Sequence, residues 1–402
     1  MTIITLLTAT FPVLMFPFLI LLLCDKKYWQ KNFAIAWGCE FSVLGYYFSP
    51  KNVVDFTRYT YVLPYYGKNS LLYLWQNDRE MLYLRDLIFH LVGRTEDYNL
   101  LSFVVALIVY SIFFYVFFDS VHNYSMDVCE SILILLLSIG AVYPFYVLNN
   151  VRNITSFVIF GFACYRDIIE NKHNLLTYLL YILPIFLHLS AVVLFFIRVL
   201  APIAKKFPVS VVVFSTAIGA LVKLLYNVSV SLPYIPFLST VITKAYQVFF
   251  LNNESDKLNF ETSDLFYRYF GMILLGIVIL LILFSNYENL RQGKKSLLEN
   301  KMISFIYLSA VIGISSLMIN SGAFIRFEAI VSFFLPIIMF PVMSRDRLEY
   351  RIPKMMANIL SLMAIPLTVI NVFLYIRFVD FRISFYDVLI TSPIRLLSKM
   401  LF

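Results

Sequence analysis

Long apolar runs recur along this chain from one end to the other, and they limit the folds that it can adopt. Ile3–Leu23, Phe103–Phe118 and Met272–Phe284 are three of these runs. A transmembrane helix needs about 20 predominantly apolar residues, whereas the strands of a membrane barrel alternate apolar and polar positions. Only 14% of the residues are charged, against about 25% in soluble domains. We therefore expect an all-α polytopic transmembrane helical bundle that forms a single integral-membrane domain over residues 1–402.

The net charge and the cysteines exclude some classes of function. The net charge is +8, but in a membrane protein an excess of Lys and Arg mainly sets the orientation, so it does not indicate a nucleic-acid partner. The four cysteines, Cys24, Cys39, Cys129 and Cys164, lie within or beside apolar runs. Their spacing matches neither a disulfide framework nor a metal site. The sequence predicts no metal and no cofactor.

Basic residues between the apolar runs predict how the helices alternate across the membrane, because Lys and Arg collect on the cytoplasmic side. This rule gives about 12 membrane helices. They are 3–23, 33–49, 98–118, 131–148, 153–169, the two halves of 174–200, 208–226, 268–285, 302–319, 326–343 and 355–376. The same rule places two large loops, 50–97 and 227–267, and an amphipathic tail, 377–402, on the outer side.

The segment Asn174–Leu200 is long enough for one span, but the charges favour two. Counted as one helix, it would place Lys205, Lys206 and every later basic cluster outside. Counted as two short helices that turn near His188, it returns them to the cytoplasm, and Pro184 favours such a break. Each arm of about 14 residues would span roughly 21 Å. We expect a short broken hairpin whose tip lies in a depression on the outer side.

Three arginines occupy the same kind of position, at the predicted outer end of a descending helix. They are Arg152, Arg268 and Arg326, and His188 opens a fourth descending helix. A cation there works against the helix dipole, whose N-terminal end is already positive. Together, the guanidinium fork and the unpaired N–H groups suit an anion such as phosphate. The alternatives are that the arginines extend to lipid headgroups and that His188 only packs in the bundle.

The first outer loop carries aromatic residues beside a pair of opposite charges. Asp55 and Arg58 are three residues apart, followed by Tyr59, Tyr61, Tyr65 and Tyr66. Aromatic rings stack on the C–H face of a sugar, and a carboxylate accepts hydrogen bonds from its hydroxyls. The alternative is an interfacial aromatic belt with a local ion pair. Downstream, Ser70–Val92 has apolar residues at helical spacing and predicts one amphipathic helix on the outer leaflet.

Several of these elements resemble a known family. They are YPFYVLNNVRNITSFVIFGFACYRDI (143–168), FLHLSAVVLFF (186–196), the D-x-x-x-Y element Asp55–Tyr59 and FIRFEAIVSFFLP (324–336). This set is similar to the EpsG-like branch of the Wzy-type polysaccharide polymerases, in which an outer arginine opens a helix and an FH-x-SA element lies downstream. In this chain Leu187 separates Phe186 from His188.

The resemblance implies a GT-C-like integral-membrane glycosyltransferase of the bacterial cytoplasmic membrane, with its active site facing outward. Such a polymerase of O-antigen, capsule or exopolysaccharide moves a growing glycan from undecaprenyl pyrophosphate to a lipid-linked repeat unit. It needs neither a metal nor a nucleotide sugar. Its partners are the lipid-linked donor and acceptor, membrane lipids, a chain-length regulator and a flippase.

Applied to this chain, the resemblance and the chemistry assign roles to nine residues. Arg152 and Arg326 would clamp the pyrophosphate, with Arg58 or Arg268 assisting. His188 is the first candidate for the general base and Asp55 the second. Glu328 would orient an arginine, and Tyr59 and Tyr65 would support the sugar.

Two other classes of function remain open from the sequence. A flippase for the same lipid-linked units would favour an inverted repeat and charges lining a path across the membrane. The sequence shows no clear internal repeat. A membrane acyltransferase that modifies surface sugars would also use a histidine near arginines. Such an enzyme takes its acyl donor from the cytoplasm, whereas His188 is predicted to face the outer side.

Overall fold

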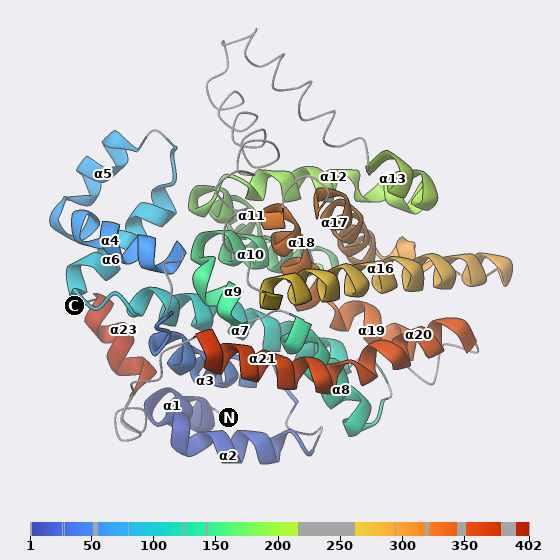
Figure 1. Ribbon diagram of the computed structural model, residues 1–402, viewed down its shortest axis with the longest axis horizontal. Coiled ribbons are helices and arrows are strands. Elements are labelled where there is room, and N and C mark those ends of the chain that lie inside the picture. Colours follow the sequence, from blue (N-terminus) through green and yellow to red (C-terminus); the bar gives the residue numbers. More distant parts are fainter. Residues whose placement is uncertain are drawn as a thin grey trace, which may run out of the picture.

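The computed structural model describes residues 2–401 apart from 26, 28, 51–54, 79, 123, 125, 142–143, 216–261, 294, 318–320, 344–350 and 379–390. The described part of the chain forms helices and their connections, with no strand. The N-terminal half contains α1 (Thr2–Thr10), α2 (Pro12–Leu22), α3 (Ala34–Tyr46), α4 (Asp55–Lys68), α5 (Leu71–Asn77), α6 (Tyr83–Thr95), α7 (Leu100–His122), α8 (Val128–Ala141), α9 (Pro144–Asn149) and α10 (Val151–Ile168). The C-terminal half contains α11 (Leu175–Leu187), α12 (Ala191–Lys206), α13 (Pro208–Ser215), α16 (Thr262–Arg291), α17 (Lys301–Leu317), α18 (Ser321–Phe333), α19 (Pro336–Met343), α20 (Arg351–Leu362), α21 (Ala364–Phe378) and α23 (Pro393–Leu401). Most of the longer helices run along one common direction (Figure 1).

Aromatic contacts fix the direction of the central helices. Trp37 and Phe41 of α3 stack on Phe114 and Tyr110 of α7, with centroids 5.0 and 4.2 Å apart, so these two helices are antiparallel. Tyr115 of α7 lies 5.3 Å from the ring of Phe162 in α10. The hydroxyl of Tyr115 also donates to Glu170, just beyond α10. The C-terminal ends of α7 and α10 therefore lie at the same end of the bundle.

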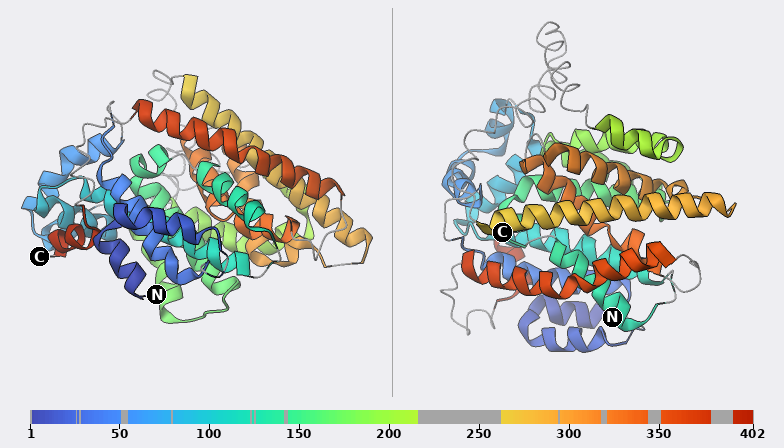
Figure 2. Two further views of the ribbon diagram at one scale, coloured as in Figure 1. Left: turned by 90° about the horizontal axis from the view of Figure 1, so that it is seen from below. Right: turned by 45° about the vertical axis from the view of Figure 1, so that its right-hand side comes forward.

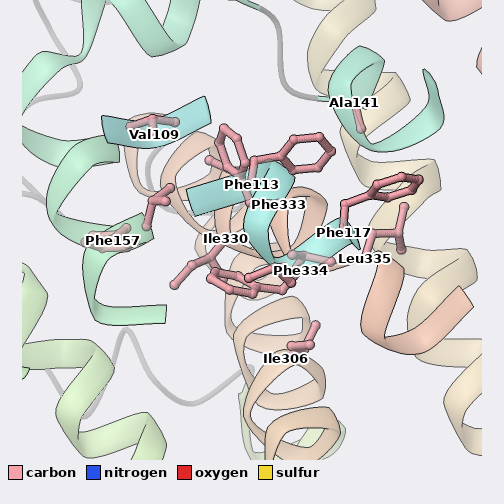
Figure 3. Packing of buried hydrophobic residues seen from close by; sticks show 14 of the residues in the cluster. Val109, Phe113, Phe117, Ala141, Phe157, Ile306, Ile330, Phe333, Phe334 and Leu335 are labelled. Carbon is pink, nitrogen blue, oxygen red and sulfur yellow. The ribbon is translucent and has the colours of Figure 1, made fainter. Parts of the chain in front are cut away.

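The helices α10 and α18 also run in parallel. Phe157 and Phe327 pack edge to face at 5.7 Å, and Gly161 packs against the ring of Phe334. Figure 3 shows Phe333 and Phe334 meeting α7 and α10 in the apolar core. We call the end that holds the N-termini of α10 and α18 the Arg152 end. The opposite end, with Lys31, is the Lys31 end.

The predicted break in 174–200 is confirmed. The first arm is α11, His188 is its C-cap residue, and the second arm is α12. The ring of Tyr181 in α11 lies 5.2 Å from that of Phe160 in α10. Because only six residues, 169–174, separate α10 from α11, the two helices pack antiparallel to each other. The tip of the hairpin therefore lies at the Arg152 end.

Other predicted helices are divided where a proline or a local turn stops hydrogen bonding. The run Ile3–Leu23, predicted as one span, is split into α1 and α2 because Pro12 cannot donate to the preceding turn. Likewise, 326–343 is bent by 46° between α18 and α19, where Pro336 begins α19. The predicted helices 131–148 and 355–376 are also each two helices.

Length and apolar character identify fewer crossings than the sequence predicts. In the described part of the chain, Leu100–His122 and Tyr269–Arg291 are long and apolar enough to span a bilayer. The bent pair Ala323–Phe333 and Pro336–Met343 gives a third candidate if it is one span. Five shorter apolar helices add to these: Pro12–Leu22, Val128–Ala141, Leu175–Leu187, Lys301–Ser316 and Met355–Ile370. The all-helical apolar bundle is as predicted, and the count of about 12 crossings stays a prediction.

The predicted outer loop 50–97 contains a helical lobe formed by α4, α5 and α6 (Figure 1). The prediction of one helix over Ser70–Val92 is wrong, because α5 ends at Asn77. The carboxylate of Asp78 accepts hydrogen bonds from the backbone of Glu80 and Leu82, and Met81 has a positive φ of 56°. These bonds offer the backbone a turn in place of a helix.

The segments 227–261 and 379–390 lie outside the described residues, as do 216–226 of the predicted helix 208–226. The remaining part of the predicted loop, 262–267, belongs to α16, which is thus longer than the predicted 268–285. Figure 2 shows α16 and α21 extending along one face of the bundle. At the C-terminus, α23 packs near α6, and Lys399 forms a 3.1 Å ion pair with Asp97.

Candidate functional site

The lobe and the bundle meet at Arg152. Its Nε donates to the hydroxyl of Tyr59 at 3.3 Å, and its guanidinium lies 5.2 Å from the centre of the same ring. The backbone N–H of Phe56 donates to the buried side chain of Asn149 at 2.9 Å. Since Asn149 ends α9 just before α10 begins, this bond holds the start of α4 against the start of α10. The geometry brings Asp55 and Tyr59 to the Arg152 end.

A second arginine reaches the same place from α18. Arg326 interacts electrostatically with Tyr59, Asp55 and Arg152. Its Nε is buried and has no hydrogen-bond partner among the described residues. A buried donor without a partner costs about 1–3 kcal/mol, so this group is ready to bond a ligand that supplies an acceptor oxygen. The two arginines come from different helices and lie near each other at the Arg152 end.

The N-terminus of α10 adds backbone donors to these side chains. The side chain of Asn150, its N-cap residue, forms no capping hydrogen bond. The first N–H groups of an α-helix have no partner within the helix and attract anions. Asp55 opens α4 and pairs with Arg58 at 3.3 Å, but the Arg58 side chain is 72% exposed. Arg58 therefore lies at the rim of the site.

His188 lies at the tip of the hairpin, at the same end as Arg152. The backbone N–H of Ser190 donates to its Nδ1 at 3.2 Å, and the hydroxyl of Ser190 is 2.6 Å from the same nitrogen. If Nδ1 accepts the N–H of Ser190, the ring proton is on Nε2, and if Nδ1–H donates to the hydroxyl of Ser190, Nε2 carries the lone pair. Only the second tautomer gives Nε2 the lone pair that a general base needs. The role of His188 as the first candidate for the general base stays a prediction.

The lobe contributes residues that sequence reasoning missed. Arg85, Asp78 and Asp86 form a buried group, with Arg85 Nη2 at 3.1 Å from Asp78 and 2.7 Å from Asp86. Burial raises the pKa of Asp86, although its bonds to Arg85 oppose this. Tyr66 lies over Arg85, 6.0 Å from its guanidinium, and also interacts electrostatically with Arg152. For Tyr66 the sequence did contain a signal, because its heptad spacing from Tyr59 places both rings on one face of a helix.

Two predicted residues, Tyr65 and Glu328, do not join this group, and the side chain of a third, Arg268, is not described. The side chain of Tyr65 is on the exposed face of α4. Glu328 is buried against Gly271 of α16. The described residues give no hydrogen bond or ion pair between Glu328 and Arg326, and the role of Glu328 in orienting an arginine stays a prediction. Arg268 lies in α16 one helical turn before Gly271, and its side chain is outside the described part.

Neither a metal centre among the described residues nor a relative identifies the chain. No cluster of three or more His, Cys, Asp or Glu that could hold a metal ion occurs within the described residues. Comparison with known protein families, with curated proteins and with solved structures gives no match. The function therefore has to be inferred from the geometry of the site itself.

Proposed function

We propose that the chain is a GT-C-like integral-membrane glycosyltransferase that polymerises lipid-linked repeat units in O-antigen, capsule or exopolysaccharide biosynthesis. One observation carries the proposal: Arg152 and Arg326, from two parallel helices, lie near Asp55 and Tyr59 of the helical lobe. Two guanidinium groups and an uncapped helix N-terminus suit a diphosphate. Aromatic rings and a carboxylate on the other side suit a sugar.

The reaction that fits this arrangement transfers a glycan from undecaprenyl pyrophosphate to a hydroxyl of the acceptor repeat unit. The acceptor oxygen bonds to the anomeric carbon, the bond from that carbon to the pyrophosphate oxygen breaks, and undecaprenyl pyrophosphate leaves with the bonding electrons. Negative charge grows on the leaving oxygen in the transition state, where positioned donors have their largest effect. Arg152 and Arg326 supply those donors, and Arg58 and Arg268 assist from the rim and from α16.

The released proton needs an acceptor. Asp55 pairs with Arg58, and a carboxylate can accept the proton of the attacking hydroxyl. When Nδ1 accepts the N–H of Ser190, His188 presents Nε2–H, and in this tautomer we assign it the role of a donor to the diphosphate or to the sugar. Tyr59 contributes its ring as a wall of the sugar site. The proposal requires no metal, since the arginines balance the charge of the diphosphate.

We assign the orientation from the basic residues beside the predicted inner helix ends. Lys31, Arg166, Lys172 and Lys205 lie at the end of the bundle opposite the site. With this end in the cytoplasm, the site faces the outside of a bacterial cytoplasmic membrane. About 12 membrane helices, some of them short, would complete the bundle.

A deletion strain tests the proposal. Loss of the gene should leave single repeat units on the lipid carrier or on the cell surface, with no longer chains. If the chain were a flippase, deletion would leave no repeat units outside. If it were an acyltransferase, full-length polymer would persist without its acyl groups. Either result would exclude the polymerase.

A further inference from the structure

One carboxylate ties both arms of the hairpin to α10. The hydroxyl of Tyr181, in α11, donates to Asp167 Oδ2 at 3.0 Å. Nη2 of Arg198, in α12, donates to the same oxygen at 2.9 Å. Nδ1 of His173, in the connection before α11, lies 2.9 Å from the other oxygen, Oδ1. We call these four residues the Asp167 cluster.

Asp167 and Arg198 of the cluster are largely buried, whereas His173 is exposed. The side chains of Asp167 and Arg198 are 19% and 21% exposed. The Nε of Arg198 is buried and has no hydrogen-bond partner among the described residues. Charges withdrawn from water inside an apolar bundle are costly and are retained where they fix a structure or serve a function.

The cluster is too far from the tip to touch a ligand held there. Tyr181 precedes His188 by seven residues and Arg198 follows it by ten, which corresponds to roughly 10–15 Å along each helix. Any effect on His188 must therefore pass through the two arms. At the tip itself, the ring of Phe186 lies 5.7 Å from that of Tyr83 at the start of α6.

We propose that the Asp167 cluster positions the hairpin, so that its tip and His188 stay against the lobe at the Arg152 end. Both arms are short, 13 and 16 residues, and one shared acceptor fixes their height relative to α10. Asp167, Tyr181 and Arg198 are thus positioning residues that touch no substrate. The consequence for catalysis rests on the proposed function, whereas the consequence for the tip does not.

Cross-linking between Phe186 and Tyr83 measures the position of the hairpin tip relative to the lobe. Tyr83→Cys and Phe186→Cys are introduced together into the full chain in membranes, with the exposed Cys24 and Cys129 replaced by serine. The rate of joining by a short bismaleimide is then compared with and without Arg198→Met. Because removing one partner of a buried pair leaves an uncompensated charge, the rate should fall at least about tenfold. Arg198→Lys keeps the charge and should recover most of the rate.

Two further variants keep the test decisive if Arg198→Met folds poorly. Tyr181→Phe removes one hydroxyl from the cluster with no change of shape and should slow cross-linking to a smaller extent. Lys205→Met is the matched control, because Lys205 is on the same helix in an exposed 3.9 Å pair with Glu299. It should leave the rate unchanged.

Polymer synthesis by the same variants separates the two proposals. For Arg198→Met, kcat should fall by about 100-fold, as expected for a misplaced group, while KM for the lipid-linked donor stays near its original value. An unchanged cross-linking rate overturns the positioning role whatever the polymer yield. A slower rate with full polymer synthesis overturns the link to His188. If the unmodified chain makes no polymer, the proposed function fails, and cross-linking still decides the position of the tip.

Discussion

Replacing Arg152 by lysine tests how the site recognises a diphosphate. Lysine keeps the positive charge but removes the Nε donor that bonds Tyr59 at 3.3 Å and the planar group that lies 5.2 Å from its ring. In the resting protein these losses are small, about 1 kcal/mol for the hydrogen bond and about 0.5–1 kcal/mol for the cation–π contact. Arg152→Lys should therefore fold normally.

The effect on the reaction should be much larger. Removing one donor aimed at a developing negative charge costs about 10²- to 10³-fold in rate. Lysine offers a point charge where arginine offers two parallel donors. We expect Arg152→Lys to lower the initial rate of chain extension by at least about 100-fold.

The assay uses purified protein in lipid vesicles with a lipid-linked repeat unit, and the products are separated by size. The control is Arg94→Lys, an exposed arginine on α6 of the same lobe, which should extend chains at the original rate. If normally folded Arg152→Lys made full-length chains at more than about a tenth of the original rate, the guanidinium clamp would be refuted.

Three further changes probe the lobe, the Lys31 end and the proton acceptor. Gly93→Ala would place a Cβ against the carbonyl of Leu63 in α4, so thermal unfolding in detergent should show a loss of about 1–3 kcal/mol. The pKa of Glu170 is lowered, with burial opposed by stronger bonds from its hydroxyl and ammonium neighbours. Its ionised form thus stabilises the fold above pH 4.5, and the stability deficit of Glu170→Gln, measured by unfolding against pH, should shrink as the pH falls below that value. At the site, Asp55→Asn should abolish chain extension, while His188→Gln, which keeps a donor, should retain more of it than His188→Ala.

Each of these three predictions has an outcome that would contradict it. A Cβ added to Gly276 of α16 would meet nothing within 4 Å, so Gly276→Ala is the control for Gly93→Ala and should stabilise by about 0.5–1 kcal/mol. Equal stability of the two alanine variants would mean that α4 and α6 separate without cost. A deficit of Glu170→Gln that grows toward acid pH would exclude the ion-paired form. Full activity of Asp55→Asn would return the role of base to His188.

The sequence predicts an element well where a local signal, such as a proline, agrees with the distribution of charged residues along the whole chain. The break in 174–200 is such a case, since Pro184 weakens the helix and the later lysines require an extra turn. The grouping of Arg152 and Arg326 at one end was also predictable, because both open helices of the same direction. In the structure this direction is fixed by contacts such as Phe157 with Phe327.

Other features were not visible in the sequence because tertiary contacts decide them. In the run Asp55–Lys68, the heptad spacing of Tyr59 and Tyr66 indicated a helix, but Pro64 in the middle of the run opposed it. The bond from Phe56 to Asn149 joins residues 93 positions apart. The role of Tyr66 depends on Arg85, which a sequence pattern cannot place. The tautomer of His188 depends on Ser190, two residues away, in the turn that follows it.

Binding of a short-chain polyprenyl pyrophosphate to the purified protein tests the convergence of Arg152 and Arg326 most directly. The measurement is a double-mutant cycle of Kd with Arg152→Lys and Arg326→Lys. If both groups hold one diphosphate, each change should weaken binding by about tenfold, and the double variant should depart from additivity. Unchanged affinity in both single variants, or strictly additive losses, would contradict a shared diphosphate site.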